Sequence, residues 1–77
     1  MSASPRNILA SRVRGGALLD IRRYVRLDTA IRRQTELAYL EGQPGDVIEF
    51  AHAETGMQIG TIRVQVRRLV TNWVWDS

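Results

Sequence analysis

Apolar and polar residues alternate most clearly between residues 47 and 67. A period of two is typical of β-strands that bury one face. The alternation is interrupted by Glu54-Thr55-Gly56, and a glycine at the end of a short loop is typical of a β-hairpin. The pattern predicts strands over residues 47–53 and 57–67. The apolar face would carry Ile48, Phe50, Ile62, Val64 and Val66, and the other face Val47, Glu49, Arg63, Gln65 and Arg67.

Residues 28–41 repeat apolar residues at helical spacing instead. Asp28 is a candidate N-cap, and Glu41-Gly42 is a candidate helix end. Pro44-Gly45 then predicts a type II turn between this helix and the hairpin. One face of the helix would carry Leu27, Ala30, Ile31, Leu37 and Ala38, with Gln34 as a polar residue among them.

The first 27 residues are less regular. Ser4-Pro5 is typical of a helix start and Gly15-Gly16 of a helix end, so the segment between them predicts a short helix. Residues 17–27 fit two patterns, a helix with one apolar face or a strand with alternating residues. We favour the helix because Arg23 interrupts the strand pattern only.

These elements predict an α+β fold, with two or three short N-terminal helices followed by an antiparallel β-hairpin. The 77 residues fit a single small domain. Its expected parts are an N-terminal arm or helix over 1–16, a helical core over 17–42, the hairpin over 46–67 and a tail over 68–77.

The charge is unevenly distributed along the chain. All 11 basic residues are arginines, and the net charge is +3. Residues 1–33 hold eight arginines and two aspartates, a net charge of +6, whereas residues 34–77 hold three arginines and six carboxylates, a net charge of −3. This asymmetry favours an anionic partner, such as a polyanion, for the first half of the chain. The alternative is a dipolar protein that packs head to tail with itself, or with nothing.

The composition also argues against several classes of function. There is no cysteine, and His52 is the only histidine, so a zinc site and a catalytic centre are not expected. We therefore expect that the protein is not an enzyme and that it binds neither a cofactor nor a small-molecule substrate. No apolar stretch is long enough to span a membrane, and the first residues lack the apolar core of a signal peptide, so the expected location is the cytoplasm of the host cell, or the virion for a phage protein.

The predicted element order resembles that of winged helix-turn-helix DNA-binding domains. Within ALLDIRRYVRLDTAIRRQTELAYLEG, LLDIRRYV would be the supporting helix, RLD the turn and TAIRRQTELAYLE the recognition helix. The hairpin over 47–67 would be the wing. Two departures from the family pattern concern the turn: Arg26 stands where glycine is common, and the spacing from Leu27 to Ile31 is about one residue short.

The resemblance implies how such a protein would bind duplex DNA. The recognition helix would enter the major groove, supporting-helix arginines would contact phosphates, and wing arginines would lie over a neighbouring phosphate or the minor groove. The residues implied are Thr29, Arg32 and Arg33 for the recognition helix, Arg22, Arg23 and Arg26 for the supporting helix and turn, and Arg63 and Arg67 for the wing.

Simpler interpretations exist for the same residues. Arg32 lies one helical turn before Glu36 and can pair with it, and the arginines of the hairpin can lie on a solvated sheet face. Trp73 and Trp75 in the tail can cover a thin core, or they can form the interface with a partner protein.

A different class of function also fits the sequence. A two-stranded hairpin is marginal alone, so a partner chain could extend its edge. The protein would then be a structural or assembly component, as a homo-oligomer or as a small subunit of a larger particle such as a phage virion. The strand interpretation of residues 17–27 favours this alternative. A small protein inhibitor of a nucleic-acid enzyme is a third possibility.

Overall fold

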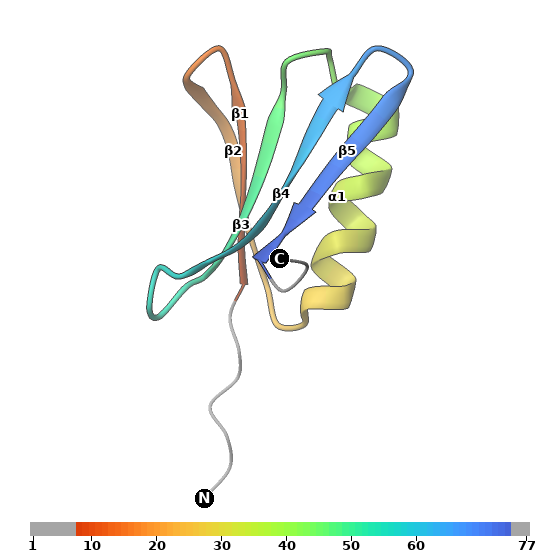
Figure 1. The fold of residues 1–77 in the computed structure, drawn as a ribbon. Coiled ribbons are helices and arrows are strands. Elements are labelled where there is room, and N and C mark those ends of the chain that lie inside the picture. The colour runs from red at the N-terminus through yellow and green to blue at the C-terminus, as the bar shows by residue number, and fades with distance from the viewer. Residues whose placement is uncertain (1–7, 75–77) are drawn as a thin grey trace, which may run out of the picture.

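A computed structural model of the chain describes residues 8–74, which form one antiparallel sheet and one helix (Figure 1). The strand order across the sheet is β2-β1-β3-β4-β5, and α1 packs on one of its two faces. The elements are β1 (Ile8–Arg14), β2 (Ala17–Tyr24), α1 (Leu27–Glu41), β3 (Val47–His52), β4 (Gln58–Gln65) and β5 (Arg68–Trp73). The prediction of two or three N-terminal helices and a single hairpin is therefore wrong.

The first predicted helix is the strand β1. Its core-facing positions near the start, Ile8 and Ala10, are buried, whereas Leu9 between them is not. Gly15 and Gly16 have φ angles of 57° and 82°, so they form the two-residue turn of the β1–β2 hairpin rather than a helix end. Such a turn requires left-handed backbone at both positions, which glycine adopts without steric cost.

Residues 17–24 form β2, so the strand alternative for this segment is the right one. Ile8 pairs with Tyr24, Ala10 with Arg22, and the register shifts by one residue between Arg12 and Val13. The adjacent Arg22 and Arg23 point to opposite faces of the sheet, as successive strand residues do. Because residues 17–24 form a strand and not the supporting helix, residues 8–74 contain no helix-turn-helix, and the prediction of a winged-helix arrangement is wrong.

The helix predicted over residues 28–41 is confirmed, and α1 begins one residue earlier, at Leu27. Its N-cap residue is Arg26, which makes no side-chain capping hydrogen bond, rather than the expected Asp28. Ala30, Gln34 and Ala38 face the sheet and are buried, and the small alanines let the helix approach the strands closely. The buried amide of Gln34 donates to the Tyr24 hydroxyl at 2.9 Å, which satisfies the polar residue on the apolar face. With 15 residues and a largely polar surface, α1 is too short and too polar to cross a membrane.

The core lies between α1 and the sheet. The predicted apolar face of the hairpin is confirmed for Ile48, Phe50, Ile62 and Val64, all of which are buried. Val66 is instead exposed, because β4 ends at Gln65. The predicted type II turn is confirmed by the φ of 98° at Gly45 and by a hydrogen bond from the amide of Asp46 to the carbonyl of Gln43.

A second turn and a further strand follow β4, which the sequence did not predict. The pairing of Gln65 with Arg68 leaves Val66 and Arg67 as the turn residues, and β5 then runs antiparallel to β4. Thr71 and Asn72 lie within this strand.

Trp73 in β5 packs on the core beside Gly60. Its ring centroid lies 5.5 Å from that of Phe50, with the rings tilted by 53°. Gly60 pairs with Trp73 across the strands, and a Cβ atom at position 60 would lie 2.2 Å from Trp73 Cε3 and 2.6 Å from the carbonyl oxygen of Asn72. Position 60 therefore requires glycine for a steric reason.

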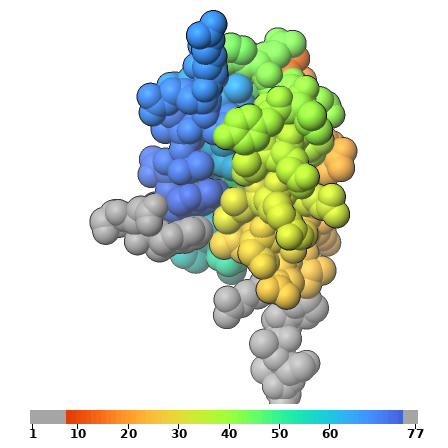
Figure 2. Space-filling view, turned by 90° about the vertical axis from the view of Figure 1, so that its right-hand side faces the viewer, coloured from red at the N-terminus to blue at the C-terminus, as the bar shows by residue number. Residues whose placement is uncertain are grey.

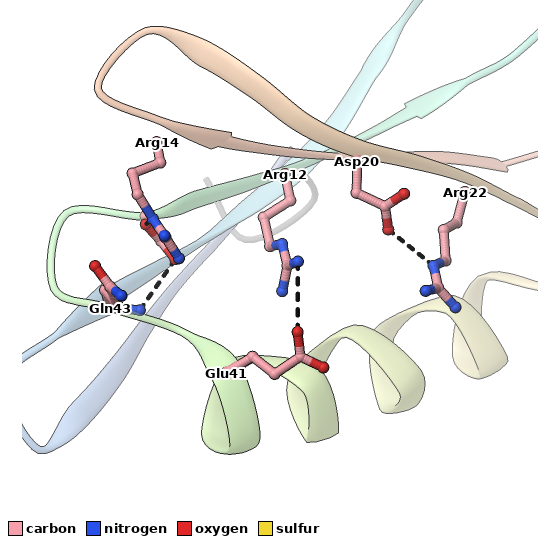
Figure 3. Close-up of polar contacts among 7 residues, drawn as sticks. Arg12, Arg14, Asp20, Arg22, Glu41 and Gln43 are labelled. Carbon is pink, nitrogen blue, oxygen red and sulfur yellow. Dashed lines mark hydrogen bonds and ion pairs between the residues drawn. The ribbon is translucent and has the colours of Figure 1, made fainter.

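The carboxylate of Asp46 joins three parts of the fold. It is fully buried and accepts hydrogen bonds from Arg14 Nε at 2.8 Å, from Arg14 Nη2 at 3.0 Å and from the amide of Gln43 at 3.0 Å. Its backbone carbonyl accepts from the amide of Val64 at 2.9 Å. In Figure 3, Arg14 of β1 reaches across to the turn at Gln43, so β1, the turn and β4 meet at this residue.

The face of the sheet away from α1 carries no second layer within residues 8–74 (Figure 1). The pairing registers place three arginines, Arg23, Arg63 and Arg68, and one carboxylate, Glu49, on this open face. The other residues of the open face are mainly aliphatic or small, including Leu9, Ser11, Val13, Ile21, Val47, Ala51, Thr61 and Val70.

Replacing Gly60 by alanine tests the contact with Trp73. The added methyl group must displace either the indole ring or the backbone of β5, so we expect Gly60→Ala to lower the free energy of unfolding by about 2–3 kcal/mol. Urea denaturation followed by circular dichroism measures the change. Unaltered stability would contradict the close packing of β4 against β5.

Replacing Asp46 by asparagine tests the buried carboxylate. The hydrogen bonds from Arg14, and the amide of Gln43 with them, hold the pKa of Asp46 below its ordinary value, although burial opposes the shift. A lowered folded-state pKa contributes stability that is present above the unfolded-state pKa of about 3.9 and is lost as the pH falls through the folded-state pKa. We expect Asp46→Asn to cost about 2 kcal/mol at pH 7 and to weaken the acid sensitivity of unfolding. Parallel stability curves for the two proteins between pH 7 and pH 3 would contradict this.

Candidate anion-binding surface

The described arginines divide into paired and unpaired groups. Four form ion pairs, and two of these pairs join the basic half of the chain to its acidic half. The pairs are Arg12–Glu41 at 3.7 Å, Arg14–Asp46 at 2.8 Å, Arg22–Asp20 at 2.8 Å and Arg26–Asp28 at 3.1 Å. The other six form no ion pair within residues 8–74: Arg23, Arg32, Arg33, Arg63, Arg67 and Arg68. Among the arginines of residues 8–74, these six have no carboxylate partner that offsets their charge.

Three of the unpaired arginines lie on one hairpin, β4–β5. Arg63 pairs with Val70, and Gln65 pairs with Arg68, so the side chains of Arg63 and Arg68 leave the same open face, on either side of the pair Val64–Leu69. Diagonal neighbours of this kind are about 7 Å apart. Arg67 stands at the turn between them. We call Arg63, Arg67 and Arg68 the arginine hairpin; all three are exposed.

Arg67 holds an unusual backbone conformation. Its φ is 64°, and it is the only described residue other than glycine with a positive φ. The left-handed conformation costs an L-residue roughly 1–2 kcal/mol, and glycine or asparagine commonly occupies such turn positions. A strained residue that glycine could replace favours a use for its side chain.

Two shallow grooves flank the arginine hairpin. One lies on the side of α1 and is lined by Tyr39, Pro44, Arg67 and Leu69 among others, and the second lies on the open face and includes Arg63. Figure 2 shows the blue β4–β5 turn projecting at one end of the molecule, beside the green C-terminal end of α1. The arginine hairpin is thus a raised cationic edge that an extended anion can reach from either side.

The other predicted binding residues are dispersed. Arg22 and Arg26 form ion pairs with neighbouring aspartates, and Arg23 lies on the open face of β2, with β1 and β3 between it and β4. Arg32 and Arg33 are exposed on α1, where Thr29 is half-buried in the first turn and donates its amide to Asp28 at 2.9 Å. The predicted residues brought together are Arg63 and Arg67, and the structure adds Arg68, which the sequence reasoning missed.

A second polar cluster lies between β1 and the C-terminal end of α1 (Figure 3). Arg12 approaches Glu41, but its Nε and Nη1 atoms are buried without a hydrogen-bond partner in the described structure. Asp46 holds the pKa of the neighbouring Arg14 above its ordinary value through their hydrogen bonds. Since these groups are largely enclosed or mutually neutralised, the cluster holds the sheet to the helix and offers little charge to a ligand.

Possible metal ligands do not gather in the described part of the chain. No group of three or more His, Cys, Asp or Glu residues lies close enough to hold an ion there. His52 is half-buried at the end of β3, opposite Ile8 of β1.

The structure tests the predictions for Trp73 only in part and those for Trp75 not at all. Trp73 is half-buried against Phe50, which corresponds to the core-covering interpretation of the sequence. Its predicted role in a partner interface stays a prediction. Trp75 lies outside the described residues.

Comparison with protein-family models, with curated proteins and with solved structures gave no match. The functional argument therefore depends on the arrangement of the residues alone.

The strain at Arg67 can be measured directly. Arg67→Gly removes a strain of roughly 1–2 kcal/mol, and the greater freedom of glycine in the unfolded chain offsets about half of this gain. We expect a net increase of about 0.5–1 kcal/mol in the free energy of unfolding by urea denaturation. Arg68→Gly at the adjacent strand position is the matched control and should lower stability. A loss of stability in Arg67→Gly would contradict the left-handed conformation.

Proposed function

We infer that the protein is a small, non-enzymatic module that binds duplex DNA through the arginine hairpin. The observation that carries this proposal is the gathering of three exposed arginines, without ion-pair partners in the described structure, on the β4–β5 hairpin. The strained backbone at Arg67 supports it, because the turn has a basic residue where glycine would be less costly.

The chemistry of arginine favours phosphate as the ligand. A guanidinium group presents a planar fork of N–H donors that matches two oxygens of one phosphate. Arg63 and Arg68 leave the same sheet face, so both can approach one strand of a nucleic acid. Each contact releases condensed counterions, and this gives affinity without sequence specificity.

The sheet face beside the arginines favours a duplex over a single strand. Proteins that bind single strands commonly stack the bases on aromatic side chains. The open face of β1–β5 instead presents aliphatic, small, amide and charged residues, while Phe50 and Trp73 lie on the side of α1. Binding would then depend on the phosphate backbone, and the protein would act in the host cytoplasm or in a virion, where duplex DNA is present.

The test is fluorescence anisotropy of a labelled random-sequence duplex at about 50 and 200 mM salt. We expect the native protein to bind and its affinity to fall steeply with salt. The double variant Arg63→Gln/Arg68→Gln should bind more weakly at low salt, and its slope of log affinity against log salt should be shallower by about 2, since each phosphate contact contributes roughly 0.9.

A matched control removes the same charge elsewhere. Arg32→Gln/Arg33→Gln also eliminates two exposed arginines without ion-pair partners in the described structure, but these lie on α1. The control should keep most of the salt slope. Equal losses in the two double variants would show that net charge alone governs binding, and no binding by the native protein at low salt would refute the proposal.

A further inference from the structure

The edge strand β2 leaves one side of its backbone unpaired in the described structure. β2 pairs with β1 on one side only, and most of its side chains are exposed (Figure 1). Natural edge strands are commonly protected by charged side chains, above all lysine, by proline, by a bulge or by a covering element. Residues 17–24 contain neither lysine nor proline, and the bulge in the pairing with β1 lies at Leu19, so the edge from Asp20 to Tyr24 can accept another strand.

The sequence of β2 is complementary to itself around Ile21. If a second copy of β2 pairs antiparallel with Ile21 opposite Ile21, then Asp20 faces Arg22 of the second copy, and Arg22 faces its Asp20. Antiparallel partners lie on the same sheet face, so both charge pairs form together. Within one chain Arg22 Nε already donates to Asp20 Oδ2 at 2.8 Å, so the two groups are oriented toward each other on that face.

Apolar surface surrounds this centre of symmetry. Ile21 is 50% exposed on the open face, and Leu18, near the start of the strand, is 57% exposed. In the paired sheet the two Ile21 side chains would lie opposite each other and lose contact with water. Burying such side chains is the main favourable contribution to association.

The neighbouring side of α1 is also self-complementary. Arg33, Glu36, Leu37 and Leu40 line one shallow hollow together with Arg22, and Leu40 is 80% exposed. A two-fold axis at Ile21 would place this side of α1 beside the same side of the second helix. Arg33 could then face Glu36 of the second copy, with the leucines between them.

We propose that the protein forms a symmetric homodimer in which the two β2 strands pair antiparallel about Ile21. The dimer has one continuous ten-stranded sheet with both helices on the same face. The arginine hairpins lie at its two outer edges, far from the interface, so dimer formation does not depend on the DNA-binding proposal.

Sedimentation equilibrium of the full chain over a range of concentrations tests the dimer. The native protein should show a concentration-dependent monomer–dimer equilibrium. Ile21→Arg places two like charges at the centre of symmetry and should raise the dimer Kd by at least about tenfold. A native protein that stays monomeric, or a dimer unaffected by Ile21→Arg, would refute the proposal.

A charge swap tests the assigned register of the dimer. Asp20→Arg and Arg22→Asp should each weaken the dimer, because each places like charges opposite each other. The double variant Asp20→Arg/Arg22→Asp restores opposite charges across the axis and should restore the dimer. Circular dichroism of each variant, at a concentration where it is monomeric, controls for folding. A folded double variant that stays monomeric, or folded single variants that dimerise as the native protein does, would refute the assigned register.

Discussion

The fold depends on one buried carboxylate, that of Asp46. It accepts hydrogen bonds from Nε and Nη2 of Arg14 and from the amide of Gln43, while the backbone carbonyl of Asp46 accepts one from the amide of Val64. A buried charge is costly unless its hydrogen-bonding capacity is filled, and here it is filled by groups from β1 and from the turn before β3. The requirement therefore fixes where β1 lies relative to β3, and with it the order of the sheet.

The same constraint explains which elements the sequence could predict. The region around Ile48, Phe50, Ile62 and Val64 faces a conventional apolar core, so its alternation was readable and its faces were predicted correctly. In β1 the α1 side carries Arg14, so apolar residues do not alternate along the whole strand. Its acidic partner Asp46 is 32 residues further along the chain, and the local sequence gives no sign of this pair. In β2 most side chains are exposed on both faces, so burial imposes little alternation, and a helical period fitted equally well.

The candidate site was only partly predictable for similar reasons. The turn at Val66 and Arg67 has no glycine, asparagine or proline to mark it, so β5 and the placement of Arg68 had no local signal. The basic and acidic halves of the chain suggested a polarised molecule, but Arg12 and Arg14 pair with Glu41 and Asp46 inside the fold. The charge left for a partner depends on these long-range pairs, which composition cannot reveal.

The strand order has a consequence for how the chain folds. The pairs β1–β2, β3–β4 and β4–β5 are joined by short turns, so each hairpin can form from residues close in sequence. Only the pairing of β1 with β3 joins strands that are separated in sequence by β2 and the whole of α1. Closing that long loop carries the largest chain-entropy cost, so docking of the two hairpin units is expected to limit the folding rate. The molecule would thus assemble from two locally formed units, β1–β2 and β3–β4–β5. Unfolding would begin with separation of β1 from β3.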